Sequence, residues 1–157
     1  MKKINLTKEK YSLISDIDFK KINHYKWYAH WGGNTFYAVR NFRMKNGKRK
    51  MIMMHRVIMK PPSNKEIDHI DGDGLNNQRN NLRICSHKQN LRNQGIPKNN
   101  TSGFKGVVWD KRDRRWRAQI RVNYKNIRLG SFKSKIEAHK EVVKAYKKYH
   151  KEFSRIL

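Results

Sequence analysis

The sequence predicts an α+β protein made of two small units joined by a short linker. Residues 115–122 alternate between polar and apolar side chains, which is typical of a half-buried strand. Residues 138–153 carry apolar side chains at spacings of three and four, which indicates one buried face of a helix. Residues 94–103 are rich in Gly, Pro and Asn and lack such periodicity. We therefore expect units at residues 1–93 and 103–157, with a linker at 94–102.

The composition indicates a polyanionic partner. The 157 residues include 38 Lys and Arg against 12 Asp and Glu, a net charge of +26. Nucleic acid is the first candidate partner and an anionic membrane surface the second. The charge divides evenly, with +13 in residues 1–93 and +13 in residues 94–157, so we expect both units to contact the same polyanion. Seventeen aromatic residues argue against a disordered basic tail.

Cysteine content and hydropathy limit the cellular compartments in which we expect the protein to act. The single cysteine, Cys85, excludes an internal disulfide and a cysteine-rich zinc site, and it fits a reducing cytosol. The N-terminus lacks an apolar signal core, and no stretch of 18 apolar residues occurs. We expect a soluble protein that does not enter a membrane.

The first unit shows three local patterns before residue 63. An aromatic run at residues 25–31 predicts a strand whose side chains build a small core. Two apolar runs, Phe36–Phe42 and Met51–Met54, flank Asn46-Gly47 and predict a β-hairpin. Residues 55–60 predict a helical turn that ends before Pro61.

Residues 67–90, IDHIDGDGLNNQRNNLRICSHKQN, combine acids, a histidine and many amides in a basic chain. We predict a strand, a loop and a helix here, with Asp68 and His69 near the start and Asn90 on the helix. A phosphodiester hydrolase needs a base for water and a positive centre for the developing charge. Histidine suits the base, because its ordinary pKa is close to neutral. Asp68 and the amide oxygen of Asn90 suit a hard cation such as Mg²⁺ or Mn²⁺.

This segment resembles the HNH nuclease motif, in the variant of phage and intron-encoded homing endonucleases that ends in asparagine. The resemblance implies a small ββα-metal nuclease domain that holds one divalent ion. It implies that Asp68 binds the metal, that His69 is the general base, and that Asn90 is the second metal ligand. Asn81, twelve residues past His69, matches the central asparagine that braces the loop and orients the histidine.

Several neighbouring residues are alternatives or accessories. His55 and Arg56 lie in HRVIM, which also recurs in this nuclease type, and we expect accessory or structural roles for them. His87 lies three residues before Asn90 and is its rival for the last position. Asn80 is the alternative to Asn81 if the register shifts by one. A calcium loop at DGDG is disfavoured, because the glutamate at its twelfth position is missing.

The second unit predicts a three-stranded antiparallel sheet packed on one C-terminal helix. On the strand at 115–122 the apolar side chains point to the helix and the polar ones to a bare face. Residues 126–132 repeat the pattern, with Ile127 and Leu129 inward. Ser134 and Glu137 form a capping box at the start of the helix. The apolar stripe of that helix comprises Ala138, Val142, Ala145, Tyr146, Tyr149 and Phe153.

Residues 102–146 resemble the DNA-binding domain of plant ethylene-response (apetala-type) transcription factors, which also occurs fused to phage HNH nucleases. The resemblance rests on FKGV, W-x-A-x-I, LGSF and the helix, and it implies that the sheet lies in the major groove. The first strand departs from the family, because Val108 and Asp110 stand where plant members carry arginines. The residues expected to contact DNA are Lys105, Trp109, Arg115, Arg117, Gln119, Arg121, Asn126 and Arg128.

Together these features predict a homing-type HNH endonuclease that hydrolyses double-stranded DNA and leaves 5′-phosphate and 3′-hydroxyl ends. One site per chain predicts a monomer that nicks one strand, whereas two chains could break both. The fused arrangement resembles mobile genes of phages, so we expect action in the bacterial cytoplasm. One alternative is a non-catalytic DNA-binding regulator with a decayed nuclease domain. Another is a basic structural or RNA-binding protein in which the acid and histidine pattern is accidental.

Overall fold

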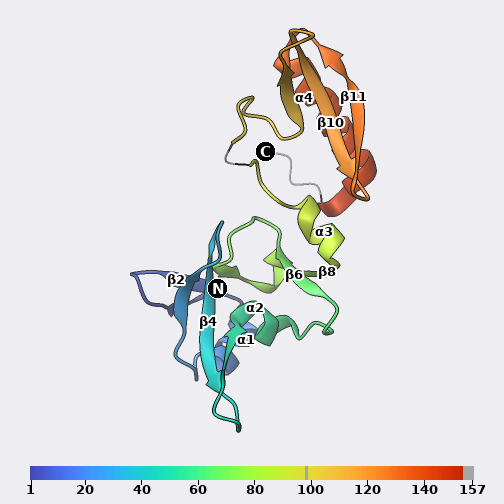
Figure 1. The fold of residues 1–157 in the computed structure, drawn as a ribbon. Helices are drawn as coiled ribbons and strands as arrows, with labels where there is room; N and C mark the ends of the chain where they lie inside the picture. The colour runs from blue at the N-terminus through green and yellow to red at the C-terminus, as the bar shows by residue number, and fades with distance from the viewer. Residues whose placement is uncertain (98, 154–157) are drawn as a thin grey trace. The chain divides into compact units, whose positions relative to one another are not determined.

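A computed structural model describes residues 1–97 and 99–153 of the chain (Figure 1). The protein is α+β, as predicted, with several small sheets and four α-helices among the described residues. It divides into two compact units, Met1–His87 and Lys88–Leu157. This division falls before the predicted linker and groups residues 94–102 with the second unit. The boundaries expected from the sequence stay a prediction.

The first unit contains three small sheets, with strand orders β1-β2-β7, β3-β4-β5 and β6-β8. Its elements are β1 (Lys2–Asn5), β2 (Tyr11–Ile14), α1 (Asp16–Ile22), β3 (Tyr28–Trp31), β4 (Phe36–Arg43), β5 (Arg49–Met53), α2 (Met54–Met59), β6 (Glu66–His69), β7 (Asn76–Asn77), the 3₁₀ turn η1 (Arg79–Asn81) and β8 (Leu82–Cys85). The helix α3 (His87–Arg92) begins at His87, which is the last residue of the first unit.

One apolar core joins these sheets. It buries side chains from β1, β2, α1, β4, α2, β6 and β8, together with Trp27 just before β3: Ile4, Ile14, Ile22, Trp27, Ala38, Met54, Ile58, Ile67 and Leu82. Trp27 is in the core, as expected for the aromatic run, but Tyr25 and Trp31 of that run are exposed, so the expectation holds only in part. The pattern search missed β1, β2 and α1, which contribute three of the buried isoleucines. A bidentate ion pair between Arg79 and the buried Asp18 (2.7 and 2.8 Å) ties α1 to η1.

The hairpin and the short helix are confirmed. β4 and β5 pair antiparallel up to Arg43 and Arg49, and the connecting loop spans Met44–Lys48. Gly47 has φ of +78°, a left-handed conformation that glycine adopts without strain. The helix α2 ends at Met59, and Lys60 caps it in a left-handed conformation just before Pro61.

The predicted strand, loop and helix over residues 67–90 needs correction, because a second strand lies between the loop and the helix. β8 (Leu82–Cys85) pairs antiparallel with β6, in the register Glu66↔Cys85 to His69↔Leu82. Both ends of β8 are buried, which anchors it to the core. β8 was not predicted because it is only four residues long and lies next to an asparagine-rich stretch. Its apolar pattern is too short to show a strand periodicity.

The second unit contains the predicted three-stranded antiparallel sheet packed on one C-terminal helix, and most of α3 also belongs to it. The strands are β9 (Val107–Asp110), β10 (Arg115–Val122) and β11 (Lys125–Phe132), in the order β11-β10-β9. They are followed by α4 (Lys135–His150) and the 3₁₀ turn η2 (Lys151–Phe153). The core contains Val107, Ala118, Ile120, Ala138, Val142, Ala145 and Tyr146.

Two details of α4 refine the prediction. The Ser134 hydroxyl accepts a hydrogen bond from the Ile136 N–H (3.1 Å), which supports the predicted cap. The assignment of Tyr149 to the buried stripe is wrong, because Tyr149 is 38% exposed. Its ring lies near Lys148 Nζ instead, 5.5 Å from the ring centroid. In the described part of the chain, no helix is long and apolar enough to cross a membrane.

Candidate active site in the first unit

Asp68 and His69 are the last two residues of β6, and both side chains are buried. The register of the β6–β8 pair sets Asp68 opposite Arg83. The Arg83 guanidinium contacts Asp68 Oδ2 through Nε (2.7 Å) and Nη2 (2.6 Å). A buried carboxylate is costly unless it is paired, so Arg83 stabilises Asp68 in its ionised form.

Asn81 braces the loop that follows His69. Its Oδ1 accepts a hydrogen bond from the Asp71 N–H (3.1 Å), and its Nδ2 donates to Asp71 Oδ1 (2.9 Å) and to the Asn76 carbonyl (2.8 Å). Its backbone carbonyl accepts from the Ile70 N–H (2.9 Å). One buried side chain therefore closes residues 70–76 into a fixed loop. Asn80 is exposed instead, which favours the register that selects Asn81.

The His69 ring also meets a buried polar chain. His69 Nε2 lies 3.5 Å from Asn77 Oδ1, and Asn77 Nδ2 donates to Ser12 Oγ (2.8 Å) and to the Gly74 carbonyl (3.3 Å). Ser12 Oγ in turn donates to the Leu75 carbonyl (2.8 Å). Because the Asn77 nitrogen is the donor, its oxygen must accept, and the proton of a neutral His69 ring belongs on Nε2.

Aromatic rings surround His69 on its other side. The ring centroid of His55 lies 5.0 Å from that of His69, and Tyr37 lies 5.9 Å from both. Gly74 lets the loop approach β4 closely, since a Cβ there would lie 2.5 Å from the Phe36 carbonyl oxygen and 2.7 Å from the Tyr37 ring. His55, expected as an accessory or structural residue, is thus a buried neighbour of His69.

Burial controls the protonation of both histidines. Burial, with smaller contributions from His69 and Arg56, lowers the pKa of His55 to about 3. Burial also lowers the pKa of His69, although Asn77 and the charges of Asp71, Asp68 and Asp73 oppose the shift. Both rings are therefore neutral at neutral pH. A neutral imidazole can accept a proton, as a general base must.

Hydrogen bonds hold Asp71 of this loop in its ionised form. Burial favours the neutral form of Asp71, but hydrogen bonds from the Asn76 side chain, the Asp73 backbone and the Asn81 side chain outweigh it and lower the pKa of Asp71. Asp71 Oδ2 accepts from Asn76 Nδ2 at 2.7 Å. Asp71 thus links the loop to Asn81 and adds negative charge near His69.

The remaining predicted residues lie elsewhere. His87 Nδ1 contacts Glu66 Oε1 (2.8 Å), and Arg56 Nη1 donates to the Lys65 carbonyl (3.2 Å), so both make contacts within the first unit. Asn90 lies on α3 and belongs to the second unit. Its role as a metal ligand stays a prediction from the motif.

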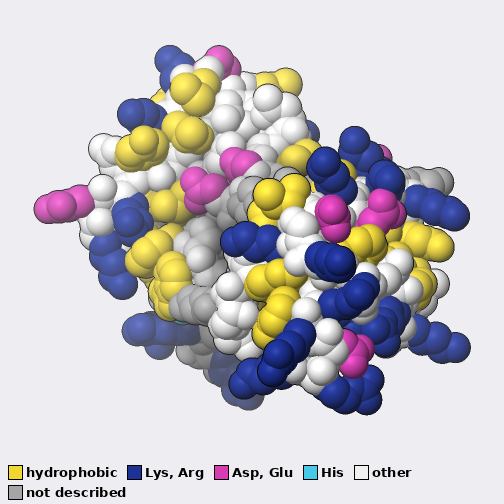
Figure 2. Space-filling model, turned by 90° about the horizontal axis from the view of Figure 1, so that it is seen from above, with side chains coloured by type: hydrophobic (Ala, Val, Ile, Leu, Met, Phe, Trp, Pro, Cys, Tyr) yellow, Lys and Arg dark blue, Asp and Glu magenta, His cyan; other side chains and the backbone are white. Residues whose placement is uncertain are grey.

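In the second unit, most of the residues predicted to contact DNA share one sheet face. Cross-strand pairs set Gln119 beside Arg128 and Arg121 beside Asn126. Arg117 contacts Asp110 (3.3 Å), so the acid of the first strand offsets part of this charge. Lys and Arg side chains cover much of the face of the protein seen in Figure 2.

Trp109 and Lys105 lie apart from this face. Trp109 pairs with Trp116, whose ring centroid is 5.0 Å away and whose side chain packs on the core. Lys105 Nζ donates to the carbonyls of Arg92 (3.0 Å) and Gln94. Neither position supports a role on the sheet face, and their contact with DNA stays a prediction.

Comparison with known proteins decides the family. Residues 53–92 match the HNH endonuclease family model, a segment that includes His55, Asp68, His69, Asn81 and Asn90. Protein 3.8 of Escherichia phage T7 is 35% identical over 94 residues, which cover 60% of this chain and 77% of that protein. The chain therefore contains an HNH endonuclease domain over residues 53–92 and is related to this phage protein. The family match ends at residue 92 and says nothing of the predicted apetala-type domain. No solved structure matched the chain.

Sequence reasoning missed three residues of this HNH site. Asn77 was not among the residues expected at the site, yet it is fully buried and contacts His69. Arg83 and Tyr37 were not singled out. No periodic pattern in β8 predicts the partner of Arg83, and only the pairing register reveals that it is Asp68. Nothing local to Tyr37 predicts its contact with two histidines.

Proposed function

We propose that this HNH protein is a divalent-metal-dependent DNA endonuclease that hydrolyses phosphodiester bonds and nicks one strand. One observation supports this most directly: the family-matched segment contains a buried neutral histidine next to a buried aspartate that pairs with Arg83, and a loop that Asn81 holds in place follows them. An exposed histidine without these neighbours would not support a role in catalysis. The products would be 5′-phosphate and 3′-hydroxyl ends.

His69 is the proposed general base. With the ring proton on Nε2 beside Asn77, the lone pair that accepts a proton from water is on Nδ1. Asn77, Asn81 and the packing of Tyr37 and His55 limit rotation of the ring, so the base does not need to reorganise when DNA binds. Asn81 is a positioning residue in this proposal.

The donor set fits a hard divalent cation. HNH endonucleases use a divalent metal ion, and Asp68 with the Asn90 amide would supply two oxygen ligands for Mg²⁺ or Mn²⁺. Arg83 contacts Oδ2 of Asp68, and a carboxylate carries further lone pairs through which it can bind a cation. Among the described residues, no three His, Cys, Asp or Glu side chains form a metal cluster, so water and phosphate would complete the coordination. The bound cation would stabilise negative charge at the scissile phosphate.

Recognition of DNA is assigned to the second unit. Its bare sheet face presents Arg115, Gln119, Arg121, Asn126 and Arg128, and the apetala-type resemblance implies that such a face enters the major groove. A nuclease site with one metal reads little sequence by itself, so register would come from this module. With the phage relative, this supports a homing-type enzyme acting as a monomer in a bacterial cytoplasm.

The alternative is a DNA-binding regulator whose nuclease site has decayed. The intact set of Asp68, His69, Asn81 and Asn90 favours the enzyme, because a decayed site would not retain the ion pair and the braced loop. Supercoiled plasmid incubated with the protein and Mg²⁺, Mn²⁺ or EDTA distinguishes the two. We expect nicked circles with either metal and none with EDTA, and loss of nicking in Asp68→Asn and Asn90→Ala. Binding without nicking under every metal condition would establish the regulator instead.

A further inference from the structure

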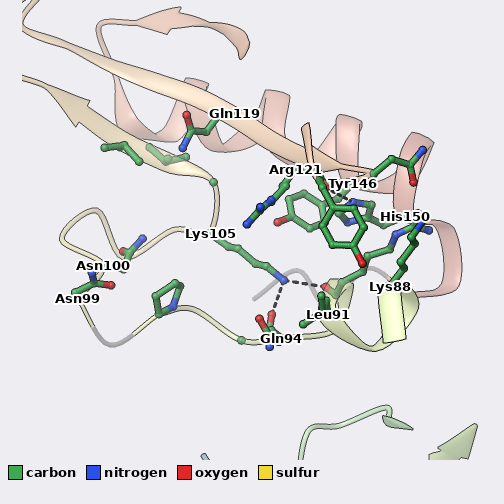
Figure 3. Close-up of a pocket in the computed structure, with 18 of the residues that line it drawn as sticks. Lys88, Leu91, Gln94, Asn99, Asn100, Lys105, Gln119, Arg121, Tyr146 and His150 are labelled. Carbon is green, nitrogen blue, oxygen red and sulfur yellow. Dashed lines mark hydrogen bonds between the residues drawn. The ribbon is translucent and has the colours of Figure 1, made fainter. Parts of the chain in front are cut away.

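The second unit contains a cavity of about 600 Å³ that lies outside the proposed nuclease site and shares Gln119 and Arg121 with the proposed duplex-reading face (Figure 3). All of its lining residues belong to the second unit. They come from α3, from residues 94–97 and 99–101, from the turn before β9 and the start of β9, from the end of β10 and the turn that follows it, and from α4. Its size is typical of sites for small organic molecules rather than for a single inorganic ion.

The cavity exists because β9 is half as long as β10. β9 pairs with β10 only from Arg115 to Ala118, so within the described part of the chain the edge beyond Ala118 has no strand partner on this side. The Gly106 carbonyl accepts from the Gln119 N–H (2.8 Å) and ends the pairing. The Arg121 and Lys105 side chains reach into the space between this edge and residues 94–97 and 99–100 (Figure 3).

The charge of the lining selects an anion. Four cations line the cavity, Lys88, Arg92, Lys105 and Arg121, and none of the described lining residues is Asp or Glu. Lys105 is engaged with backbone carbonyls, which leaves the other three to pair with a ligand phosphate. A purely apolar ligand would leave these charges without a partner.

The aromatic and amide groups select a planar, hydrogen-bonding ligand. Tyr124 is 54% exposed at the rim, with Lys88 Nζ 5.3 Å from its ring centroid. Gln119 and Asn123 add amides that can donate and accept. His150 lines the same cavity and is 3% exposed, and its Nε2 lies 3.1 Å from the Arg121 carbonyl. Nδ1 of His150 has no hydrogen-bond partner among the described residues, so a buried acceptor remains for a ligand N–H.

We propose that this cavity binds a single unstacked nucleotide, whose base stacks on Tyr124 and whose phosphate pairs with Lys88, Arg92 and Arg121. The base edge then faces the amides and His150. The nucleotide can come from a single-stranded or opened stretch of DNA or from a free mononucleotide, since both offer the same phosphate and base. A DNA strand as the source of the nucleotide rests on the proposed function as a DNA endonuclease, whereas the binding of a nucleotide in this cavity does not.

The test uses the full chain in EDTA, so that no cleavage occurs, and three fluorescent probes. They are a single-stranded hexanucleotide with a central 2-aminopurine, the same hexanucleotide in a duplex, and 2-aminopurine deoxyribonucleoside 5′-monophosphate. Stacking on Tyr124 should change the 2-aminopurine fluorescence of the single strand. Tyr124→Asn removes the ring at a position with φ of +66°, which asparagine tolerates, and should weaken binding about tenfold. Tyr149→Ala, on α4 outside the cavity, should bind as the wild type does.

The role of the cations that line the cavity is tested by one variant and a matched control. Lys88→Gln should lower the slope of log affinity against log salt by about one, because it removes one phosphate contact, and the exposed Lys140→Gln on α4 should leave the slope unchanged. A hexanucleotide that binds more tightly than the monophosphate assigns the cavity to a DNA strand. Equal affinity of the two assigns it to free nucleotides.

Equal binding of all probes by Tyr124→Asn and Tyr149→Ala would overturn the proposal. Plasmid nicking with Mg²⁺, measured on the same preparations, separates this outcome from failure of the nuclease proposal. Nicking without Tyr124-dependent binding leaves the nuclease standing and removes the nucleotide site. Tyr124-dependent binding without nicking supports the nucleotide site and contradicts the nuclease proposal.

Discussion

Replacing Asn81 by alanine removes the side chain that closes the loop after His69. Three hydrogen bonds are lost, to the Asp71 N–H, to Asp71 Oδ1 and to the Asn76 carbonyl. At about 1 kcal/mol each, the loss should lower the free energy of unfolding of the first unit by about 3 kcal/mol. The exposed neighbour Asn80 is the matched control, and Asn80→Ala should change that free energy by less than about 0.5 kcal/mol.

Amide hydrogen exchange in this loop reports the effect residue by residue. The Asp71 N–H bonds to the Asn81 side chain and should lose at least about tenfold of its protection in Asn81→Ala, the equivalent of one such bond. The Ile70 N–H bonds to the Asn81 backbone carbonyl, which alanine retains, so it should lose less. Urea unfolding followed by circular dichroism gives the stability change. Equal destabilisation by Asn80→Ala and Asn81→Ala would refute the assignment of Asn81 as the brace.

Three further predictions follow from charge and burial. Between pH 6.5 and about 3 the unfolded state binds a proton at His55 that the folded state does not bind. The free energy of unfolding should therefore be highest above pH 6.5 and should fall by up to about 1.4 kcal/mol for each unit by which the pH is lowered. In urea titrations, His55→Gln should reduce this dependence of the free energy of unfolding on pH. Arg83→Met leaves the buried Asp68 charge unpaired and should cost about 3 kcal/mol of stability at pH 7, and a calorimetric change below 1 kcal/mol would contradict the buried pair. Arg128→Ala should reduce discrimination between target and random DNA about tenfold at fixed salt, whereas Lys140→Ala, at an exposed position on α4, should leave this discrimination unchanged, as competition gel shifts would show.

The sequence predicted the second unit well because one face of its sheet is buried along the whole length of β10. Eight residues of strict alternation leave one possible assignment, and the bounds of β10 matched the prediction. Cross-strand pairing then put Gln119 and Arg121 beside the polar residues of β11, as the alternation in both strands required. The one bulge, between Ala118 and Gln119, did not disturb these faces.

The first unit was harder to predict, for a physical reason. Its strands are mostly four residues long, and their partners are distant in sequence, so little of their stability is encoded locally. β2 pairs in parallel with β7, and only this pairing brings Ser12 to Asn77 and so to His69. The motif predicted the residue types of the site, but the buried contacts that hold His69 depend on the tertiary fold.

The most direct measurement of the central claim is the single-turnover cleavage rate of His69→Ala on saturating DNA with Mg²⁺. If His69 is the general base, the rate should fall by about 10²- to 10⁴-fold relative to the wild type. The dissociation constant for the same DNA in EDTA should stay within about twofold, because the side chain is buried and contributes no charge to DNA binding at neutral pH. His24→Ala, an exposed histidine of the first unit, should cleave at the wild-type rate. A His69→Ala enzyme that cleaves as fast as the wild type would contradict the account.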